Sequence, residues 1–158
     1  MGGAGNDVAY GGSESDSISG GIGSDSLYGG SGTDNIVGGD GDDLIDGGDG
    51  TDTADYSDRT NTVSIILSTG QALGDKETSG DTLISIENAR GGSGNDVLTG
   101  SDESNELIGG GGNDNLDGGN GNDVLYSGDG DDVVNGGSGV DTADFSAASS
   151  AITVDLVA

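Results

Sequence analysis

The polar and apolar positions of this chain repeat every nine residues. Six units begin at Gly2, Gly11, Gly20, Gly29, Gly38 and Gly47, and six more begin at Gly91, Gly100, Gly109, Gly118, Ser127 and Gly136. The eighth position of every unit is Ala, Ile, Leu or Val, whereas the first six positions are mostly Gly, Ser, Asn and Asp. The last three residues of each unit therefore predict a very short strand with one inward side chain, and the first six predict a turn.

A three-residue strand has too few contacts to be stable alone, so the pattern predicts strands that stack in parallel. Two units then form one coil of 18 residues with a strand on each side, and successive coils rise by about 4.8 Å. The eighth-position side chains of the two sides meet in a thin core. We therefore predict an all-β solenoid whose turns form two columns along its edges.

The composition requires a cationic partner if the chain is to fold. Thirty acidic and three basic residues give a net charge of −27, and only 29% of the residues are hydrophobic. Such a chain stays disordered unless its charge is neutralised. Nucleic acid and anionic membranes are not expected partners because they bind Lys and Arg, and no apolar run is long enough to insert into a membrane.

The residue types narrow the chemistry further. The chain has no Cys and no His, which removes the usual zinc and copper sites and His-based acid–base catalysis. We therefore expect no enzymatic activity within these residues. The sixth position is Asp in eleven of the twelve units, Asn105 being the exception, so each column of turns is a ladder of aspartates.

Stacked carboxylates repel one another unless a cation lies between them. Ca²⁺ suits such a site because it prefers oxygen and accepts about 6–8 ligands at roughly 2.3–2.6 Å, whereas Mg²⁺ demands stricter geometry. Carboxylates from two stacked turns and main-chain carbonyls would share the coordination. A flexible linker would not keep twelve aliphatic residues in one frame, and the EF-hand-like window from Asn113 has Val124 where Glu is required.

The unit GGxGxDxUx, in which U is apolar, resembles the RTX, or haemolysin-type, calcium-binding repeat. The resemblance implies a right-handed parallel β-roll in which several Ca²⁺ ions lie between turns two repeats apart, with at most four sites in each run. Glu14 and the unit from Gly100, which has Ser101, Glu103 and Asn105, depart from the pattern, which leaves the sites of the Gly100 unit open. The implied side-chain ligands are Asp7, Asp16, Asp25, Asp34, Asp43, Asp52, Asp96, Asp114, Asp123, Asp132 and Asp141, joined by turn carbonyls such as those of Gly21, Gly23, Gly30, Gly32, Gly39, Gly41, Gly110, Gly112, Gly119 and Gly121.

The repeats divide the chain into four segments. Residues 2–55 and 91–144 are the two repeat runs, 56–90 form an irregular insert that continues the solenoid, and 145–158 are the start of a second such insert. The insert carries all three basic residues and five acids, a net charge of −2. Within it, Val63, Ile65 and Leu67 predict a strand, Asp81–Thr82–Leu83 repeats the spacing of positions six to eight, and a loop is expected near 70–80.

The end of the chain repeats the start of the insert. Ile152, Val154 and Leu156 match the three strand residues of the insert, and Phe145 matches Tyr56. We expect both aromatic residues to cover the edge of the stack or pack on its core, and the natural chain to continue beyond Ala158. Solenoid ends need capping, so an open end is expected to allow end-to-end or edge self-association.

These observations lead to two functional hypotheses. The first is a calcium-binding structural module that folds on calcium binding after secretion, as part of a larger extracellular or cell-surface protein of the adhesin kind. The alternative is the accessory domain of an extracellular enzyme such as a protease, a lipase or an alginate-modifying enzyme. In both, the resemblance implies type I secretion from a bacterium.

Overall fold

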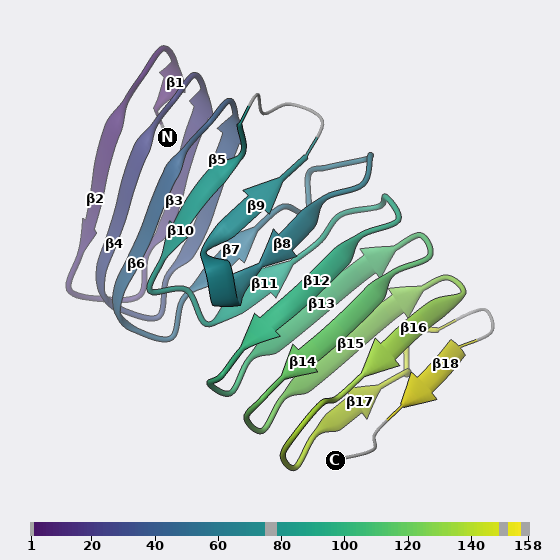
Figure 1. The fold of residues 1–158 in the computed structure, drawn as a ribbon. Coiled ribbons are helices and arrows are strands. Elements are labelled where there is room, and N and C mark those ends of the chain that lie inside the picture. Colours follow the sequence, from purple (N-terminus) through teal and green to yellow (C-terminus); the bar gives the residue numbers. More distant parts are fainter. Residues whose placement is uncertain (1, 75–78, 149–151, 156–158) are drawn as a thin grey trace. The chain divides into compact units, whose positions relative to one another are not determined.

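The computed structural model describes residues 2–74, 79–148 and 152–155, and it shows a parallel β-solenoid (Figure 1). Every regular element in this part of the chain is a strand, except the 3₁₀ turn η1 (Leu67–Thr69). The chain divides into two compact units. Unit 1 comprises Met1–Asp55 and Gly70–Ile86, and unit 2 comprises Tyr56–Thr69 and Glu87–Ala158. The all-β solenoid expected from the nine-residue period is confirmed.

Unit 1 consists of two layers of strands that alternate along the chain (Figure 1). One layer contains β1 (Gly3–Ala4), β3 (Ser17–Ile22), β5 (Asn35–Asp40) and β7 (Thr53–Asp55), in that spatial order. The other contains β2 (Val8–Gly12), β4 (Ser26–Gly32), β6 (Leu44–Gly50), β10 (Asp81–Ile84) and β9 (Gln71–Leu73). All pairs described here are parallel except β9 with β10.

Unit 2 repeats this arrangement. One layer contains β11 (Asn88–Arg90), β13 (Glu106–Gly111), β15 (Val124–Asp129) and β17 (Thr142–Asp144). The other contains β8 (Ser64–Ile66), β12 (Val97–Ser101), β14 (Asn115–Gly119), β16 (Asp132–Asn135) and β18 (Ile152–Asp155), all paired in parallel.

The register of 18 residues places the eighth positions of the repeats against one another. Leu27 pairs with Ile45 in β4 and β6, and Leu107 pairs with Leu125 in β13 and β15. Ten of the twelve eighth-position side chains are buried, and only Ala9 and Ala143 are half-buried. One buried aliphatic residue in nine makes the thin core that the sequence predicts.

Most repeat strands are longer than the three residues expected, although β7 and β17 have that length. β4 and β6 each have seven residues because the pairing continues through the first glycines of the next repeat, as in Gly30↔Gly48. Adjacent glycines have no side chains to hold the backbones apart. The ladder of hydrogen bonds therefore extends into the first residues of the next repeat, where the sequence predicts a turn. This extension stiffens the entry to each turn.

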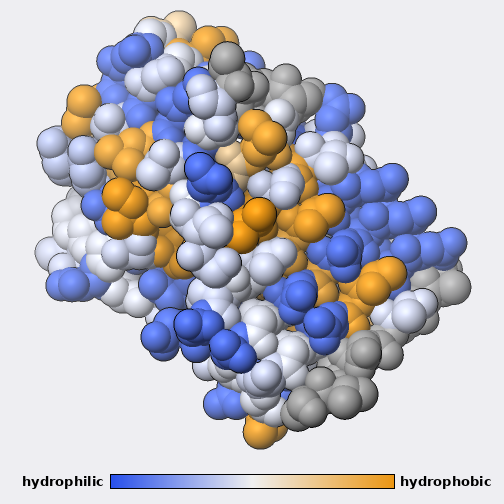
Figure 2. Space-filling model, in the orientation of Figure 1, coloured by the Kyte–Doolittle hydropathy of each residue, from blue (hydrophilic) through white to orange (hydrophobic). Residues whose placement is uncertain are grey.

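The outward side chains are mixed. On the β2–β10 side of unit 1, Val8, Tyr10 and Ile84 are exposed, and the rings of Tyr10 and Tyr28 stack with centroids 5.0 Å apart. Figure 2 shows apolar side chains lying among polar ones over these strands. The sheet faces are thus less polar than the turns, where the acidic residues gather.

The insert supplies strands to both units. β10 pairs in parallel with β6 so that Leu83 lies beside Ile45, and β8 pairs in parallel with β12 so that Ile65 lies beside Leu98. The expectation that Leu67 would extend β8 is wrong: the chain turns into η1 after Ile66, whose carbonyl accepts the Thr69 hydroxyl at 3.3 Å.

The expected loop near residues 70–80 holds a short strand, β9, antiparallel to β10. Residues 75–78 lie outside the described part of the chain. The return to the solenoid is fixed by Asp42, whose carboxylate accepts the backbone N–H of Ser79 at 2.8 Å and that of Gly80 at 3.2 Å.

The C-terminal segment forms β18, which pairs in parallel with β16. Its predicted residue Leu156 lies outside the described residues. Tyr56 is buried and Phe145 is half-buried, which agrees with packing of both rings against the stack.

Candidate metal sites in the turn columns

The sixth-position aspartates of unit 1 form two continuous columns. In each, one carboxylate oxygen, Oδ1, accepts the backbone N–H of the aspartate one coil earlier, at 2.7–2.8 Å. The first column contains Asp7, Asp25, Asp43 and Asp81, and the second contains Asp16, Asp34 and Asp52. The stacking of the coils therefore builds the predicted ladder.

Unit 2 contains two further columns with the same hydrogen bond, at 2.8–3.1 Å. The first contains Asp96, Asp114 and Asp132, and the second contains Asn105, Asp123 and Asp141. Val63 stands next to Asp96 at the start of the first column, where its N–H donates to Asp96 Oδ1 at 2.8 Å. Asn105, the one sixth-position residue without a carboxylate, thus still occupies a regular place in its column.

The second carboxylate oxygen, Oδ2, is buried in most turns. Within the described part of the chain it has no hydrogen-bond donor in Asp7, Asp25, Asp34, Asp114, Asp123 and Asp132. A buried carboxylate oxygen without a donor is costly, and the cost falls only if a cation or a proton reaches it. These six oxygens are the strongest structural indication of a cation-binding site.

Five of these six oxygens border a small space at the first glycine of their own turn, and the sixth, that of Asp132, lies in the turn that begins with Ser127. A Cβ added to Gly20 would lie 2.2 Å from Asp25 Oδ2 and 2.5 Å from the carbonyl oxygen of Gly38 in the next coil. The equivalent Cβ on Gly109 would lie 2.4 Å from Asp114 Oδ2 and 2.5 Å from the Ser127 carbonyl oxygen. A side chain is excluded here, and the bordering atoms are oxygens.

The pKa values of the column aspartates also show that burying these carboxylates is unfavourable. The pKa of Asp114 is raised to about 7: burial is the main cause, the backbone hydrogen bond from Asp96 opposes it, and the neighbouring carboxylates of Asp96 and Asp132 add to the rise. Burial likewise raises the pKa of Asp52 and Asp123. Negative charge in these turns is therefore unfavourable in the absence of a cation.

The turn carbonyls complete the set of oxygen donors. Those of Gly21, Gly30 and Gly110 lie close to the equivalent glycine one coil later, so they are directed along the column. Among the described residues, no three acidic side chains come together closely enough to hold a metal by themselves. Any ion must therefore take part of its coordination from the main chain, and this all-oxygen donor set fits Ca²⁺.

Two residues of the columns depart from the simple pattern. Asp81 is not among the expected ligands, although its spacing to Leu83 matches that of positions six and eight in a repeat. The structure places Asp81 in the first column of unit 1, with 2% of its surface exposed. Ser127 replaces the first glycine of its unit, and its buried hydroxyl has no hydrogen-bond partner among the described residues. Its turn also contains the orphan oxygen of Asp132.

Comparison with known families identifies the repeats. The RTX calcium-binding nonapeptide repeat matches in four copies, at residues 1–36, 28–58, 90–125 and 108–143. These matches cover more than half of the chain, so the protein belongs to this family. No curated protein matches the chain. The family and the solenoid together define a calcium-binding RTX module.

Proposed function

We propose that this chain is a structural module of a secreted bacterial protein, that it is disordered without Ca²⁺, and that it folds when Ca²⁺ binds in the columns of turns. The observation that carries this proposal is the set of buried carboxylate oxygens that lack a hydrogen-bond donor. They make the folded state unfavourable without a cation and favourable with one. The sixth-position aspartates and the turn carbonyls would supply the ligands.

The energetics support coupling between folding and binding. With one buried aliphatic in nine residues and a net charge of −27, apolar burial is too sparse to order the chain by itself. Each independent site would contribute about 2.7 kcal/mol at a free Ca²⁺ concentration one hundred times its Kd.

The same coupling suits a protein that acts outside the cell. Calcium sites of extracellular modules typically have a Kd of about 10⁻⁴–10⁻³ M, so the chain would stay unfolded inside a bacterium and fold after export. RTX repeats occur typically in secreted bacterial proteins. The described part of the chain has no helix long and apolar enough to cross a membrane. We propose that the module stiffens part of a larger adhesin-like surface protein.

Small-angle X-ray scattering tests the proposal. In chelator, the radius of gyration should approach the value of about 42 Å expected for an unfolded chain of this length. Addition of Ca²⁺ should reduce it well below that value, whereas an equal concentration of Mg²⁺ should leave it almost unchanged. A compact chain in chelator, or equal compaction by both ions, would contradict the proposal.

A further inference from the structure

The backbone at the second position divides the twelve turns into two kinds. In ten turns this residue is a glycine with φ between 88° and 124°, a conformation that residues with a side chain rarely adopt. The two exceptions are Gly92 and Ser101, neither of which has a positive φ. We call the ten turns open and these two turns, at residues 91–96 and 100–105, closed.

In the closed turns the second-position N–H donates into the turn. Gly92 N–H donates to Asp96 Oδ2 at 2.7 Å, and Ser101 N–H donates to Asn105 Oδ1 at 2.7 Å. Asp96 therefore has a protein donor for each of its oxygens, because its Oδ1 accepts the N–H of Val63. In the open turn of Asp114, by contrast, Oδ2 is buried without a donor.

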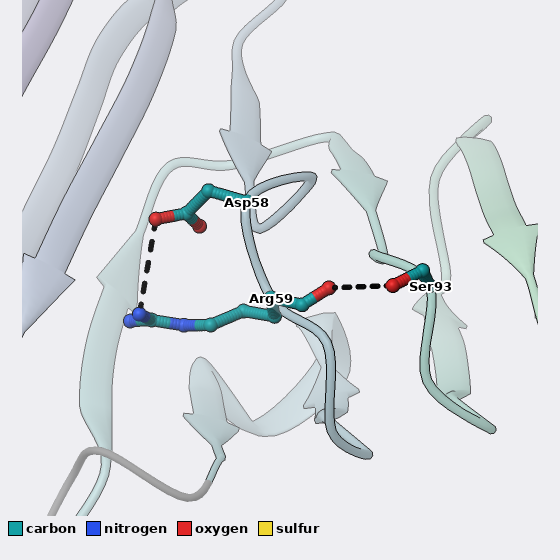
Figure 3. A network of polar contacts seen from close by, with 3 residues as sticks. All are labelled: Asp58, Arg59 and Ser93. Atoms are coloured by element: carbon teal, nitrogen blue, oxygen red, sulfur yellow. Dashed lines mark hydrogen bonds and ion pairs between the residues drawn. The ribbon is translucent and has the colours of Figure 1, made fainter.

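Both closed turns lie against residues of the insert on the side of the preceding coil, and against a repeat turn only on the side of the following coil. The carbonyl of Arg59 accepts the backbone N–H of Ser93 at 2.9 Å and its hydroxyl at 3.4 Å (Figure 3). On the other edge, Asn105 Nδ2 donates to the Glu87 carbonyl at 2.6 Å. The insert thus holds each closed turn by direct hydrogen bonds.

The coil next to the turn of Asp96 also lacks the residue that a metal would need. Register places Val63 at the sixth position, so its side chain contributes no oxygen. The open turn at 127–132 is the opposite case. Even where Ser127 replaces glycine, its hydroxyl and Asp132 Oδ2 are both buried and have no hydrogen-bond partner in the described part of the chain.

We infer that the two columns of unit 2 each begin with a turn that requires no metal, and that Asp96 is a structural hydrogen-bond acceptor and not a calcium ligand. Ca²⁺ is taken up by the open turns that follow, beginning with those of Asp114 and Asp123. This inference rests on the proposed function, because it assigns the calcium sites to particular repeats. The insert-bound turns then serve as the base on which the metal-dependent coils stack.

The test is the number of Ca²⁺ ions bound at saturation, measured by native mass spectrometry on the full chain. The variant Asp96→Asn recreates the closed turn of Asn105 and should bind as many ions as the wild type. Its matched partner Asp114→Asn should lose at least one ion. The reverse change, Asn105→Asp, should add none.

Loss of an ion in Asp96→Asn, gain of an ion in Asn105→Asp, or an unchanged number in Asp114→Asn would overturn the inference. If Asp114→Asn does not fold, Asp123→Asn takes its place, and the first two variants still decide the outcome. Failure of the wild-type protein to bind any Ca²⁺ would instead refute the proposed function. The two failures are therefore distinguishable.

Discussion

Replacement of Gly109 by alanine should disable one calcium site, because the space at this glycine is bordered by oxygens and admits no side chain. The new Cβ would lie 2.4 Å from Asp114 Oδ2 and 2.5 Å from the Ser127 carbonyl oxygen. These atoms must move apart, and overpacking of this kind costs about 1–3 kcal/mol. Loss of one ion adds about 2.7 kcal/mol when Ca²⁺ is one hundred times above its Kd.

Gly111, on the same strand β13, provides a matched control. A Cβ added there meets nothing closer than 3.9 Å, and its φ is not positive. Gly111→Ala should leave stability unchanged or raise it by up to about 1 kcal/mol, because alanine reduces the entropy of the unfolded chain.

The assay is urea unfolding at a fixed saturating Ca²⁺ concentration, together with the Ca²⁺ midpoint of folding. Gly109→Ala should lose about 4–6 kcal/mol, a large part of the roughly 5–15 kcal/mol that stabilises a typical domain. Its Ca²⁺ midpoint should also rise. Equal stability and equal midpoints for the two variants would refute the assignment of the space at Gly109 to a metal.

Three further predictions concern the core, the pH dependence of stability and the buried side chain of Arg59. Leu116→Ala should lower the free energy of unfolding by about 2–5 kcal/mol in chemical denaturation, whereas alanine at the partly exposed Val97 should change it by less than about 1 kcal/mol. In chelator, the raised pKa of Asp114 predicts that folding stability is greatest below about pH 3.9, the pKa of Asp in the unfolded chain, and is lost as the pH rises through about 7. Circular dichroism should therefore show more β-structure at pH 5 than at pH 8. The opposite order would contradict this prediction. Arg59→Ala should lower the free energy of thermal unfolding by roughly 1–3 kcal/mol, because this side chain is 1% exposed and its guanidinium lies 5.9 Å from the ring centroid of Tyr56. Alanine at the exposed Arg90 should have little effect.

The nine-residue period was sufficient to predict the solenoid. Because every eighth position is aliphatic, only one register buries these residues together, and Leu27 and Ile45 pair in that register. The same period predicts the columns, since the sixth position always lies two residues before the buried eighth position, at the end of the turn. Asp81 shows that the rule extends into the insert: the spacing from Asp81 to Leu83 matches a repeat, and both residues join unit 1.

Other features depend on tertiary contacts that no pattern encodes. Gly91–Gly92 reads like any other repeat, yet Gly92 lacks a positive φ, and the preceding coil beside it comes from the insert and not from a repeat. Arg59 stands in a polar segment and would be expected at the surface, but its side chain is buried. Leu67 fits the alternation of a strand, but the chain turns before it.

The central claim is that Ca²⁺ drives the folding of this module, and a calcium titration followed by far-UV circular dichroism tests it most directly. When Ca²⁺ is added to the chelated chain, we expect a cooperative change from coil to β-structure at about 0.1–1 mM Ca²⁺, with no such change at equal Mg²⁺. A full β-signal in chelator, or none at any Ca²⁺ concentration, would contradict it.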